Sequence, residues 1–424
     1  MSQAIAQSEA AHIMLDLSRS KVNSATAIRV KIFPHERDYP PHGIDKLRDS
    51  LLVESDKPCT LFAAPADQMV ASGKALKRGL SFRFSAPEWE GAGRMLQCPA
   101  GFRLMRGQKN ELTYTGRLYL HLSDGAIEAI NLVSLDEYIR GVVPSEVYRD
   151  WPMEALKTQA VAARTYAVYH YLNSQRSNSG RLWDVDDTIQ FQAYTGTSLR
   201  HPRTDAAVEA TDGQILTYQG QVIQAFYHAE SGGHTEEATA VWDRPIPFTA
   251  SRPEAAGLPM KHSIWERKID LDELGRELIE AGILKEGQLL RQITVPLAGR
   301  TPSGRVRFLT AFDQKGRAVT FPLQHLRRLV GNLPSLLFEI QVQSKSFVEL
   351  RGIGNGHGIG MSQMGAAALA SQKSWSYPQI LSYYYVKTTL CHLNDQPLET
   401  RLPNCFEDSS RYAAGRRSPL SPAG

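Results

Sequence analysis

The hydrophobic and polar positions near the start of the chain alternate in short segments that are typical of β-strands. From Ala27 the run AIRVKIF alternates, and further segments rich in β-branched and aromatic residues follow between Gly, Pro and Asp: TLFAAPA, SFRFSA, ELTYTGRLYLHL and AIEAINLV. We therefore predict a β-rich module over residues 27–125, preceded by a polar, flexible segment over residues 1–26.

The pattern changes to helical spacing after the segment LDEYIRGVVPSEVYRDWP. Asp150 can cap a helix there, Pro152 fits its first turn, and Glu154 suits the positive end of the helix dipole. Apolar side chains then recur at a helical period, at Leu156, Ala160, Ala163, Ala167 and Tyr171. We predict a long helix from Met153 to Leu172.

The region over residues 126–395 mixes helical and strand-like patterns. Helices are predicted at Arg203–Thr211, in LDELGRELIEAG, at Met361–Ser371 and at Pro378–Tyr385, and strands in GQILTYQGQVIQAFYHA, RQITVPLA, GRVRFLTAFD and SFVELRGIG. The tail over residues 396–424 lacks periodicity and is predicted to be disordered. The pattern predicts an α+β fold of β-rich modules, with a long helix after a turn and a central substrate cleft.

Composition and charge narrow the classes of function. The chain has 424 residues, and 42% of them are hydrophobic, which is enough for a large buried core. A formal charge of +4, without a run of like charges, argues against nucleic acid as a partner. No stretch of about eighteen apolar residues occurs, so no membrane span is predicted, and no signal peptide is visible near the N-terminus.

The four cysteines are widely scattered and include no CxxC pair, which argues against a closed zinc site. Cys391 and Cys405 are close enough in sequence to form a disulfide in an exported protein, and unpaired thiols are the alternative.

Three segments contain residues that could carry chemistry, and the first is GVVPSEVYRDWP. It places Glu146 in a turn ahead of the long helix, where apolar neighbours would raise the pKa of its carboxyl group and suit it to general acid/base work. The alternative is a solvated glutamate. Lys157 and Arg164, seven residues apart, share one face of the following helix. They are candidates to bind substrate or to hold Glu146, and solvent exposure is the alternative for Lys157.

The second segment is AFYHAESGGHTEEA, in which a strand leads into paired glycines. Paired glycines allow a tight turn and a close approach of the backbone to a ligand. The polar residues around this turn are candidates to line one concavity: Tyr227, His228, Ser231 and His234. A serine hydrolase is the competing interpretation, but the sequence has no GxSxG motif there.

The third segment is GIGNGHGIGMSQMGAAALA, with glycines at alternate positions around His357. The spacing predicts a backbone turn pressed against another surface and then a helix. It fits neither the GxGxxG nor the GxxxxGK[ST] pattern of nucleotide-binding loops. A zinc site at His357 lacks a HExxH motif or a nearby cysteine, so no metal is predicted.

Taken together and in this order, the segments resemble the SpoIID/LytB family of sporulation and wall-remodelling proteins. The resemblance covers roughly residues 27–390, and the matching stretches are LDEYIRGVVPSEV, EALKTQAVAARTYAVYH, AYTG, AVEATDGQILTYQGQVIQAFYHAESGGHTE, TPSGRV, GIGNGHGIGMSQMGAAALA and YPQILSYYYVKT. The family's catalytic glutamate corresponds to Glu146 and its supporting cations to Lys157 and Arg164. Its substrate cleft corresponds to Tyr227, His228, Ser231, His234 and His357.

The resemblance implies a lytic transglycosylase that needs no cofactor. Such an enzyme cleaves between N-acetylmuramic acid (MurNAc) and N-acetylglucosamine (GlcNAc) in peptidoglycan glycan strands free of stem peptides, and leaves 1,6-anhydro-MurNAc ends. Ordinary glycosidases need two carboxyl groups, whereas here the C6 hydroxyl of the sugar attacks and one glutamate suffices. The implied location is the cell envelope, which contrasts with the lack of a visible signal peptide.

The resemblance also implies a comparison at the segment DVDDTIQFQAYTG, where some members of the family hold a Cys/His/Cys zinc cluster. The matching positions are Asp186, Gln190 and Phe191, so we predict that hydrogen bonding or packing replaces a structural zinc. The competing function is a non-catalytic peptidoglycan-binding protein that enhances a cell-wall amidase, and a scaffolding role in the envelope is a third.

Overall fold

The computed structural model describes residues 27–32, 51–63, 82–84, 93–106, 110–123, 126–176, 181–188, 190–242, 245–254, 263–323, 333–393 and 404–405. Helices and mixed sheets occur together, which confirms the predicted α+β class. The predicted flexible start, and the predicted disordered tail apart from residues 404–405, lie outside the described residues.

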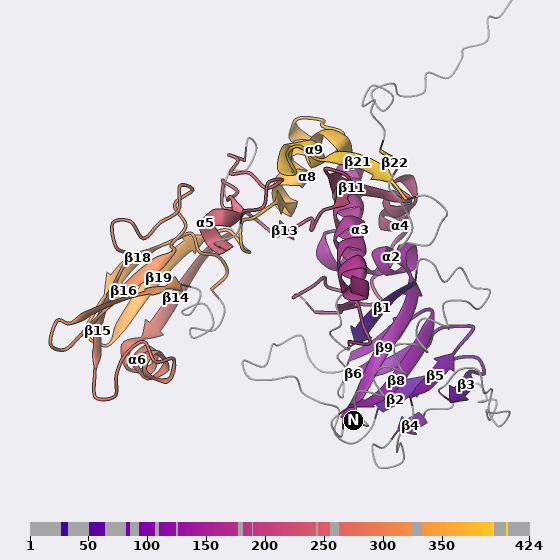
Figure 1. The fold of residues 1–424 in the computed structure, drawn as a ribbon, viewed down its shortest axis with the longest axis horizontal. Helices are drawn as coiled ribbons and strands as arrows, with labels where there is room; N and C mark the ends of the chain where they lie inside the picture. The colour runs from indigo at the N-terminus through magenta and orange to yellow at the C-terminus, as the bar shows by residue number, and fades with distance from the viewer. Residues whose placement is uncertain are drawn as a thin grey trace, which may run out of the picture.

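The N-terminal part forms two β-sheets (Figure 1). The six-stranded sheet has the order β10 (Val185–Asp186), β1 (Ala27–Ile32), β9 (Ala126–Ser134), β8 (Arg117–Ser123), β5 (Arg94–Gln97) and β3 (Thr60–Ala63). The four-stranded sheet has the order β4 (Phe82–Phe84), β2 (Leu51–Glu54), β6 (Phe102–Arg106) and β7 (Asn110–Tyr114). The predicted boundary at residue 125 falls between β8 and β9, which are paired neighbours in one sheet.

Disulfide bonds occur in both the N-terminal and the C-terminal part of the chain. Cys59 and Cys98 form a disulfide across 39 residues, a pair that the sequence analysis did not propose because their spacing carries no motif. Cys391 is disulfide-bonded as well, and it lies directly opposite Cys405 in the register of β21 (Thr389–His392) and β22 (Asn404–Cys405). The predicted pairing of Cys391 with Cys405 agrees with this register.

Three helices share a hydrophobic core with the six-stranded sheet: α2 (Leu135–Glu146), α3 (Met153–Arg176) and α4 (Pro202–Ala210). Helices α2 and α3 contact strands of the sheet, and α4 packs against these two helices. The predicted long helix corresponds to α3 and runs one turn further. The segment that contains Glu146 was predicted to be a turn, and this is wrong, because Glu146 is the last residue of α2. Apolar side chains at helical spacing bury one face of α2 and stabilise it despite Pro144.

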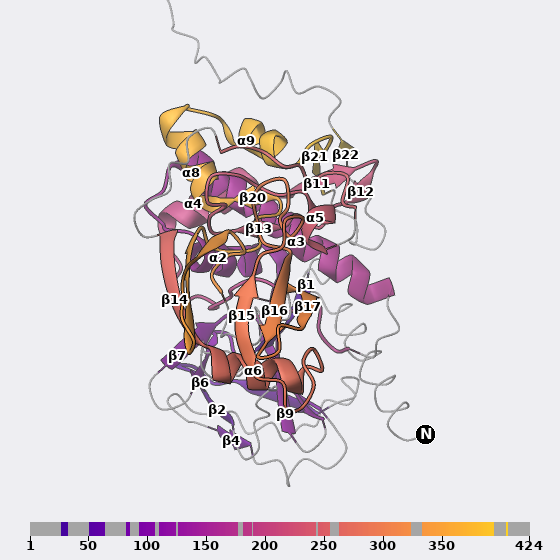
Figure 2. The same ribbon diagram turned by 90° about the vertical axis from the view of Figure 1, so that its left-hand side faces the viewer.

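The C-terminal part packs against α3. Strand β11 (Gln214–Tyr218) pairs with β12 (Gln221–Val222) and with β21, while β13 (Tyr227–His228) pairs in parallel with β20 (Met361–Ser362). Both ribbon views place α8 (Gln363–Gln372) and α9 (Tyr377–Tyr384) beside one end of α3 (Figures 1 and 2). The predicted helices at Met361 and Pro378 therefore exist, with bounds shifted by one or two residues.

A second unit is inserted between α5 (Ala238–Trp242) and β20. It contains the sheet β14 (Ile264–Asp270), β19 (Phe347–Ile353) and β18 (Phe338–Gln343), the sheet β15 (Leu290–Thr294), β16 (Phe308–Asp313) and β17 (Ala318–Pro322), and helix α6 (Leu271–Glu280). These elements surround a hydrophobic core of their own, and Figure 1 shows them extending away from the helices and the N-terminal sheets. Within the described part of the chain, no helix combines the length and apolar character needed to cross a bilayer.

Candidate active site

The carboxyl group of Glu146 lies where four separate parts of the chain converge. One oxygen accepts a hydrogen bond from the backbone N–H of Ala193, with an N–O distance of 2.7 Å. The other accepts one from Nε2 of Gln363 in α8 at 3.3 Å, and the hydroxyl of Tyr227 in β13 is a third hydrogen-bonding partner. The end of α2, the segment before α4, β13 and α8 thus position a single carboxyl group.

Burial shifts the acidity of this carboxyl group. The Glu146 residue is half-buried, and its carboxyl group has three hydrogen-bonding partners from the protein. Desolvation raises the pKa of Glu146, while the hydrogen bonds from Ala193, Gln363 and Tyr227 work in the opposite direction and do not cancel it. The protonated form therefore persists to a higher pH than in a solvated glutamate, as general acid catalysis requires.

Neutral amide and phenol groups hold the partners of Glu146 in place. Gln192 is fully buried, and its Nε2 donates to the hydroxyl of Tyr227 at 2.9 Å while its Oε1 accepts from Tyr138 at 3.3 Å. Gln363 also reaches Oε1 of Gln159, at 3.4 Å. Because these partners carry no charge, they orient the carboxyl group without neutralising it.

Sequence reasoning missed Gln192 and Gln363. Gln363 lies in the third segment, directly after Ser362, whose side chain caps α8. Its position at the first turn of a predicted helix, following the glycine run, was the available signal. Gln192 carried no comparable signal, because its partners come from α2, α3 and β13 and are 54, 29 and 35 residues away.

The glycine-rich third segment packs closely against β13, as its spacing predicts. A Cβ atom at Gly360, whose φ is 72°, would lie 2.2 Å from the carbonyl oxygen of Phe226. A Cβ atom at Gly356, whose φ is 113°, would lie 2.6 Å from the Cβ atom of His228. Only glycine fits at these positions, and the close approach lets β20 pair with β13 and bring Gln363 to Glu146.

Tyr227 and His228 are adjacent in β13, so their side chains point to opposite sides. Tyr227 faces Glu146, whereas the ring of His228 lies 5.4 Å from the ring of His357. Nδ1 of His228 lies 3.2 Å from the carbonyl oxygen of Ile359, and burial lowers the pKa of His228 well below its usual value. His228 is therefore a neutral residue that joins β13 to the glycine-rich segment.

Ser231 and His234 stabilise the turn after β13. The hydroxyl of Ser231 is buried, accepts a hydrogen bond from the backbone N–H of Gly233 at 3.1 Å and bonds to the carboxyl group of Glu254. Nδ1 of His234 lies 2.7 Å from the carbonyl oxygen of Thr235. Burial raises the pKa of Glu254, which sequence reasoning did not single out because the surrounding SRPEAAG segment contains no motif.

Arg164 does not line the site. The residue is fully buried, and its guanidinium donates to the carbonyl oxygens of Val208 at 3.2 Å, Thr211 at 2.8 Å and Gln214 at 3.4 Å. Asp136 lies 3.6 Å from its Nη2. The prediction that Arg164 contacts substrate is therefore wrong, because the guanidinium ties α3 to the end of α4 and the start of β11.

Lys157 also makes its contacts elsewhere. Its Nζ lies 2.8 Å from Oε1 of Glu154 and over the ring of Tyr377, 5.7 Å from the centroid. Oε2 of Glu154 accepts from the backbone N–H of Tyr377 at 2.8 Å. These contacts join α3 to the start of α9, and they do not include Glu146.

The positions that match the zinc cluster of some relatives are joined by other interactions. Oδ1 of Asp186 accepts hydrogen bonds from the backbone N–H of Thr188 at 2.8 Å and from its hydroxyl at 2.6 Å. The backbone N–H of Gln190 donates to the same hydroxyl at 3.2 Å. Phe191 packs edge-on against His170 with ring centroids 4.9 Å apart. Hydrogen bonds hold this segment together internally, and aromatic packing connects it to α3.

Comparisons with known proteins indicate a class related to sporulation and the cell wall. The family model described as "Stage II sporulation protein" matches residues 123–218. Stage II sporulation protein D of Bacillus subtilis is 31% identical over 281 residues, which cover 62% of this chain and 76% of that protein. An uncharacterized protein of Brachyspira hyodysenteriae is 33% identical over 279 residues, which cover 65% of this chain and 72% of that protein.

The chain therefore belongs to the SpoIID family. The amidase enhancer of Bacillus subtilis is also similar, at 29% identity over 295 residues, which cover 59% of this chain. The match spans only 40% of the amidase enhancer, so most of that protein has no counterpart here.

Proposed function

We propose that this chain is a peptidoglycan lytic transglycosylase in which Glu146 acts as both general acid and general base. The observation that carries the proposal is the Glu146 carboxyl group, which belongs to a half-buried residue, has a raised pKa and is held by three neutral partners. Family membership supports a cell-wall substrate. The proposed substrate is the bond between MurNAc and GlcNAc in glycan strands free of stem peptides.

The reaction proceeds in two proton transfers. Protonated Glu146 gives its proton to the bridging oxygen as the bond from that oxygen to C1 of MurNAc breaks, and GlcNAc leaves with a free hydroxyl group. The resulting carboxylate then accepts the proton of the C6 hydroxyl as its oxygen bonds to C1, which forms the 1,6-anhydro ring. The Ala193 N–H and the Gln363 amide stabilise the carboxylate between these steps.

The other residues of the predicted cleft hold Glu146 and Gln363 in position. Tyr227 donates to Glu146, while His228 and His357 hold the glycine-rich segment that carries Gln363. Ser231 and His234 keep the neighbouring turn in shape, and Lys157 supports the site indirectly by holding α9 against α3.

Asp186 provides a test against a hydrolase with two carboxylates. The charge of Asp186 raises the pKa of both Tyr138 and Tyr166, and so does the charge of Glu146. The two carboxyl groups therefore lie in the same neighbourhood. Oδ1 of Asp186, however, already accepts two hydrogen bonds from Thr188. We expect Asp186→Asn to keep its activity. A folded Asp186→Asn protein without activity would instead favour the two-carboxylate mechanism of ordinary glycosidases.

The direct test is digestion of denuded glycan strands with the wild-type protein and with Glu146→Gln, followed by mass analysis of the ends. We expect the wild type to release 1,6-anhydro-MurNAc ends, and the variant to release at least a hundredfold fewer because it cannot transfer protons. Ordinary reducing ends would point to hydrolysis. Equal release by both proteins would remove Glu146 from the mechanism.

The similarity to the amidase enhancer favours one alternative, a non-catalytic protein that binds peptidoglycan and stimulates a cell-wall amidase. In that case neither protein would release anhydro ends, and both would bind wall material and raise the rate of an added amidase equally. Action outside the cytoplasm is common to both functions. The Cys59–Cys98 disulfide supports it, because such bonds persist in oxidising compartments.

A further inference from the structure

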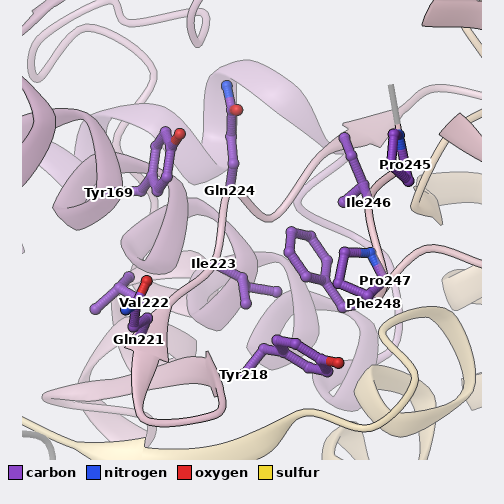
Figure 3. Close-up of a pocket in the computed structure, with 10 residues that line it drawn as sticks. All are labelled: Tyr169, Tyr218, Gln221, Val222, Ile223, Gln224, Pro245, Ile246, Pro247 and Phe248. Carbon is purple, nitrogen blue, oxygen red and sulfur yellow. The ribbon is translucent and has the colours of Figure 1, made fainter. Parts of the chain in front are cut away.

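A hollow of about 240 Å³ opens beside α3, between β12 and the segment at residues 245–248 (Figure 3). Three aromatic rings and two amides contribute to its lining: Tyr169, Tyr218, Phe248, Gln221 and Gln224. In Figure 3, Tyr169, Val222 and the two glutamines lie on one side, and Phe248 lies opposite with Pro245 and Pro247. None of the described residues that line the hollow carries a charge.

This lining matches the chemistry of a neutral amino-sugar ring. A pyranose has an apolar face that stacks on aromatic rings, and its edge carries hydroxyl and acetamido groups that pair with amides and phenols. The volume lies below the range of about 300–1,000 Å³ typical of sites for drug-sized ligands, so it suits about one ring. A MurNAc residue would bring a lactyl carboxylate that finds no cation among these residues.

Uncharged side chains fill the protein interior between the hollow and Glu146. The ring of Tyr227 lies 6.3 Å from that of Tyr166, which in turn lies 4.4 Å from the ring of His170. Nε2 of His170 is 3.3 Å from Nε2 of Gln224, which lines the hollow. Burial lowers the pKa of His170 to about 4, so its ring is neutral near pH 7.

Helix geometry explains how these side chains are arranged. Tyr166, Tyr169 and His170 are spaced three and four residues apart on α3, so they share one face of the helix. Tyr166 points toward the catalytic end, and Tyr169 lines the hollow. One face of a single rigid helix therefore connects the two places.

We propose that this hollow is a distal subsite that binds a GlcNAc residue of the glycan strand, away from the bond that is cleaved. The proposal rests on the proposed function, because the occupant is taken to be a residue of the glycan strand that Glu146 would cleave. Such a subsite would make binding depend on the length of the glycan strand. Because the subsite is neutral, it would also select GlcNAc over MurNAc at that position and so fix which sugars lie beside Glu146.

The test measures binding separately from turnover. In the Glu146→Gln background, the tetramer of GlcNAc is titrated by calorimetry into the full chain, into Tyr169→Ala and into Gln221→Trp. Gln221 is exposed, so a tryptophan there fills the mouth without disturbing the core. We expect both variants to raise Kd about tenfold. The control is Lys387→Ala, which changes an exposed residue of the neighbouring hollow and should leave Kd unchanged.

Several outcomes overturn the subsite. These are absence of tetramer binding, a Kd that neither variant changes, and a preference for MurNAc-terminated over GlcNAc-terminated fragments. Binding of a proline-rich peptide in place of the tetramer, sensitive to Tyr169→Ala, would assign the aromatic hollow to peptide recognition instead.

The subsite and the catalytic proposal fail in different ways. If the wild type releases no anhydro ends while tetramer binding still depends on Tyr169, the catalytic proposal falls and the subsite stands. If anhydro ends form while Tyr169→Ala and Gln221→Trp leave both Kd and the cleavage of long strands unchanged, the subsite falls alone.

Discussion

Replacing Arg164 by alanine tests whether this buried cation serves the fold or the chemistry. The guanidinium satisfies carbonyl oxygens of Val208, Thr211 and Gln214 in a region without access to water. Truncation removes the guanidinium donor from these carbonyl groups, although those of Val208 and Thr211 keep a backbone donor, and it opens a cavity between α3 and α4. The gain from no longer burying a charge offsets part of this loss.

The expected loss of unfolding free energy in Arg164→Ala follows from these contacts. Each lost hydrogen bond from the guanidinium to a buried carbonyl group costs about 0.5–3 kcal/mol, and truncation of a large buried side chain costs about 2–5 kcal/mol through the cavity it leaves. We therefore expect Arg164→Ala to lower the free energy of unfolding by about 3–5 kcal/mol. Arg164→Lys keeps the charge but loses the forked geometry, and should fall in between.

Denaturant unfolding and hydrogen exchange provide the assay. Amides of α4 and β11 should exchange faster in Arg164→Ala at a denaturant concentration at which the wild type is protected. Arg140→Ala is the matched control, because this partly exposed arginine pairs with Asp205 at 3.6 Å and should cost less than about 1 kcal/mol. A fully stable Arg164→Ala protein that has lost glycan binding would refute this reasoning.

Three further predictions follow from the site and the disulfide. Burial raises the pKa of Glu146 above its ordinary value of 4.5, so the folded wild type binds this proton more tightly than the unfolded chain does. The free energy of unfolding therefore falls as the pH rises from about 4.5 through the raised pKa. Glu146→Gln should therefore resist urea better than the wild type at pH 8 and equally at pH 4, and equal resistance at both would contradict the raised pKa. Gln363→Leu removes a hydrogen bond that lowers this pKa, so the alkaline limb of the pH–rate profile should move to higher pH, and a downward move would exclude the assigned role. Replacing Cys59 and Cys98 by alanine should destabilise the N-terminal sheets by about 3–4 kcal/mol in urea titrations, whereas an unchanged midpoint would show that the loop is held by other contacts.

Local patterns along the chain determined the main elements and the choice of Glu146 as the candidate acid. Helical spacing predicted α3 to within one turn, because most of its apolar side chains face one shared core. Alternate glycines predicted a close packing contact, and Gly356 and Gly360 make it. Apolar neighbours of Glu146 predicted a raised pKa, and the direction agrees. The groups around the carboxyl, however, come from remote segments at Ala193, Tyr227 and Gln363.

Only the tertiary structure decided which partners meet. Gln363 reaches Glu146 across 217 positions, and Gln192 reaches Tyr227 across 35, and neither pairing leaves a periodic trace in the sequence. The spacing of Lys157 and Arg164 on one helix face made Arg164 a candidate to bind substrate or to hold Glu146, but its guanidinium donates to carbonyl groups 44 to 50 residues away. Periodicity records which face of an element is buried, whereas the destination of a polar side chain depends on how the elements pack.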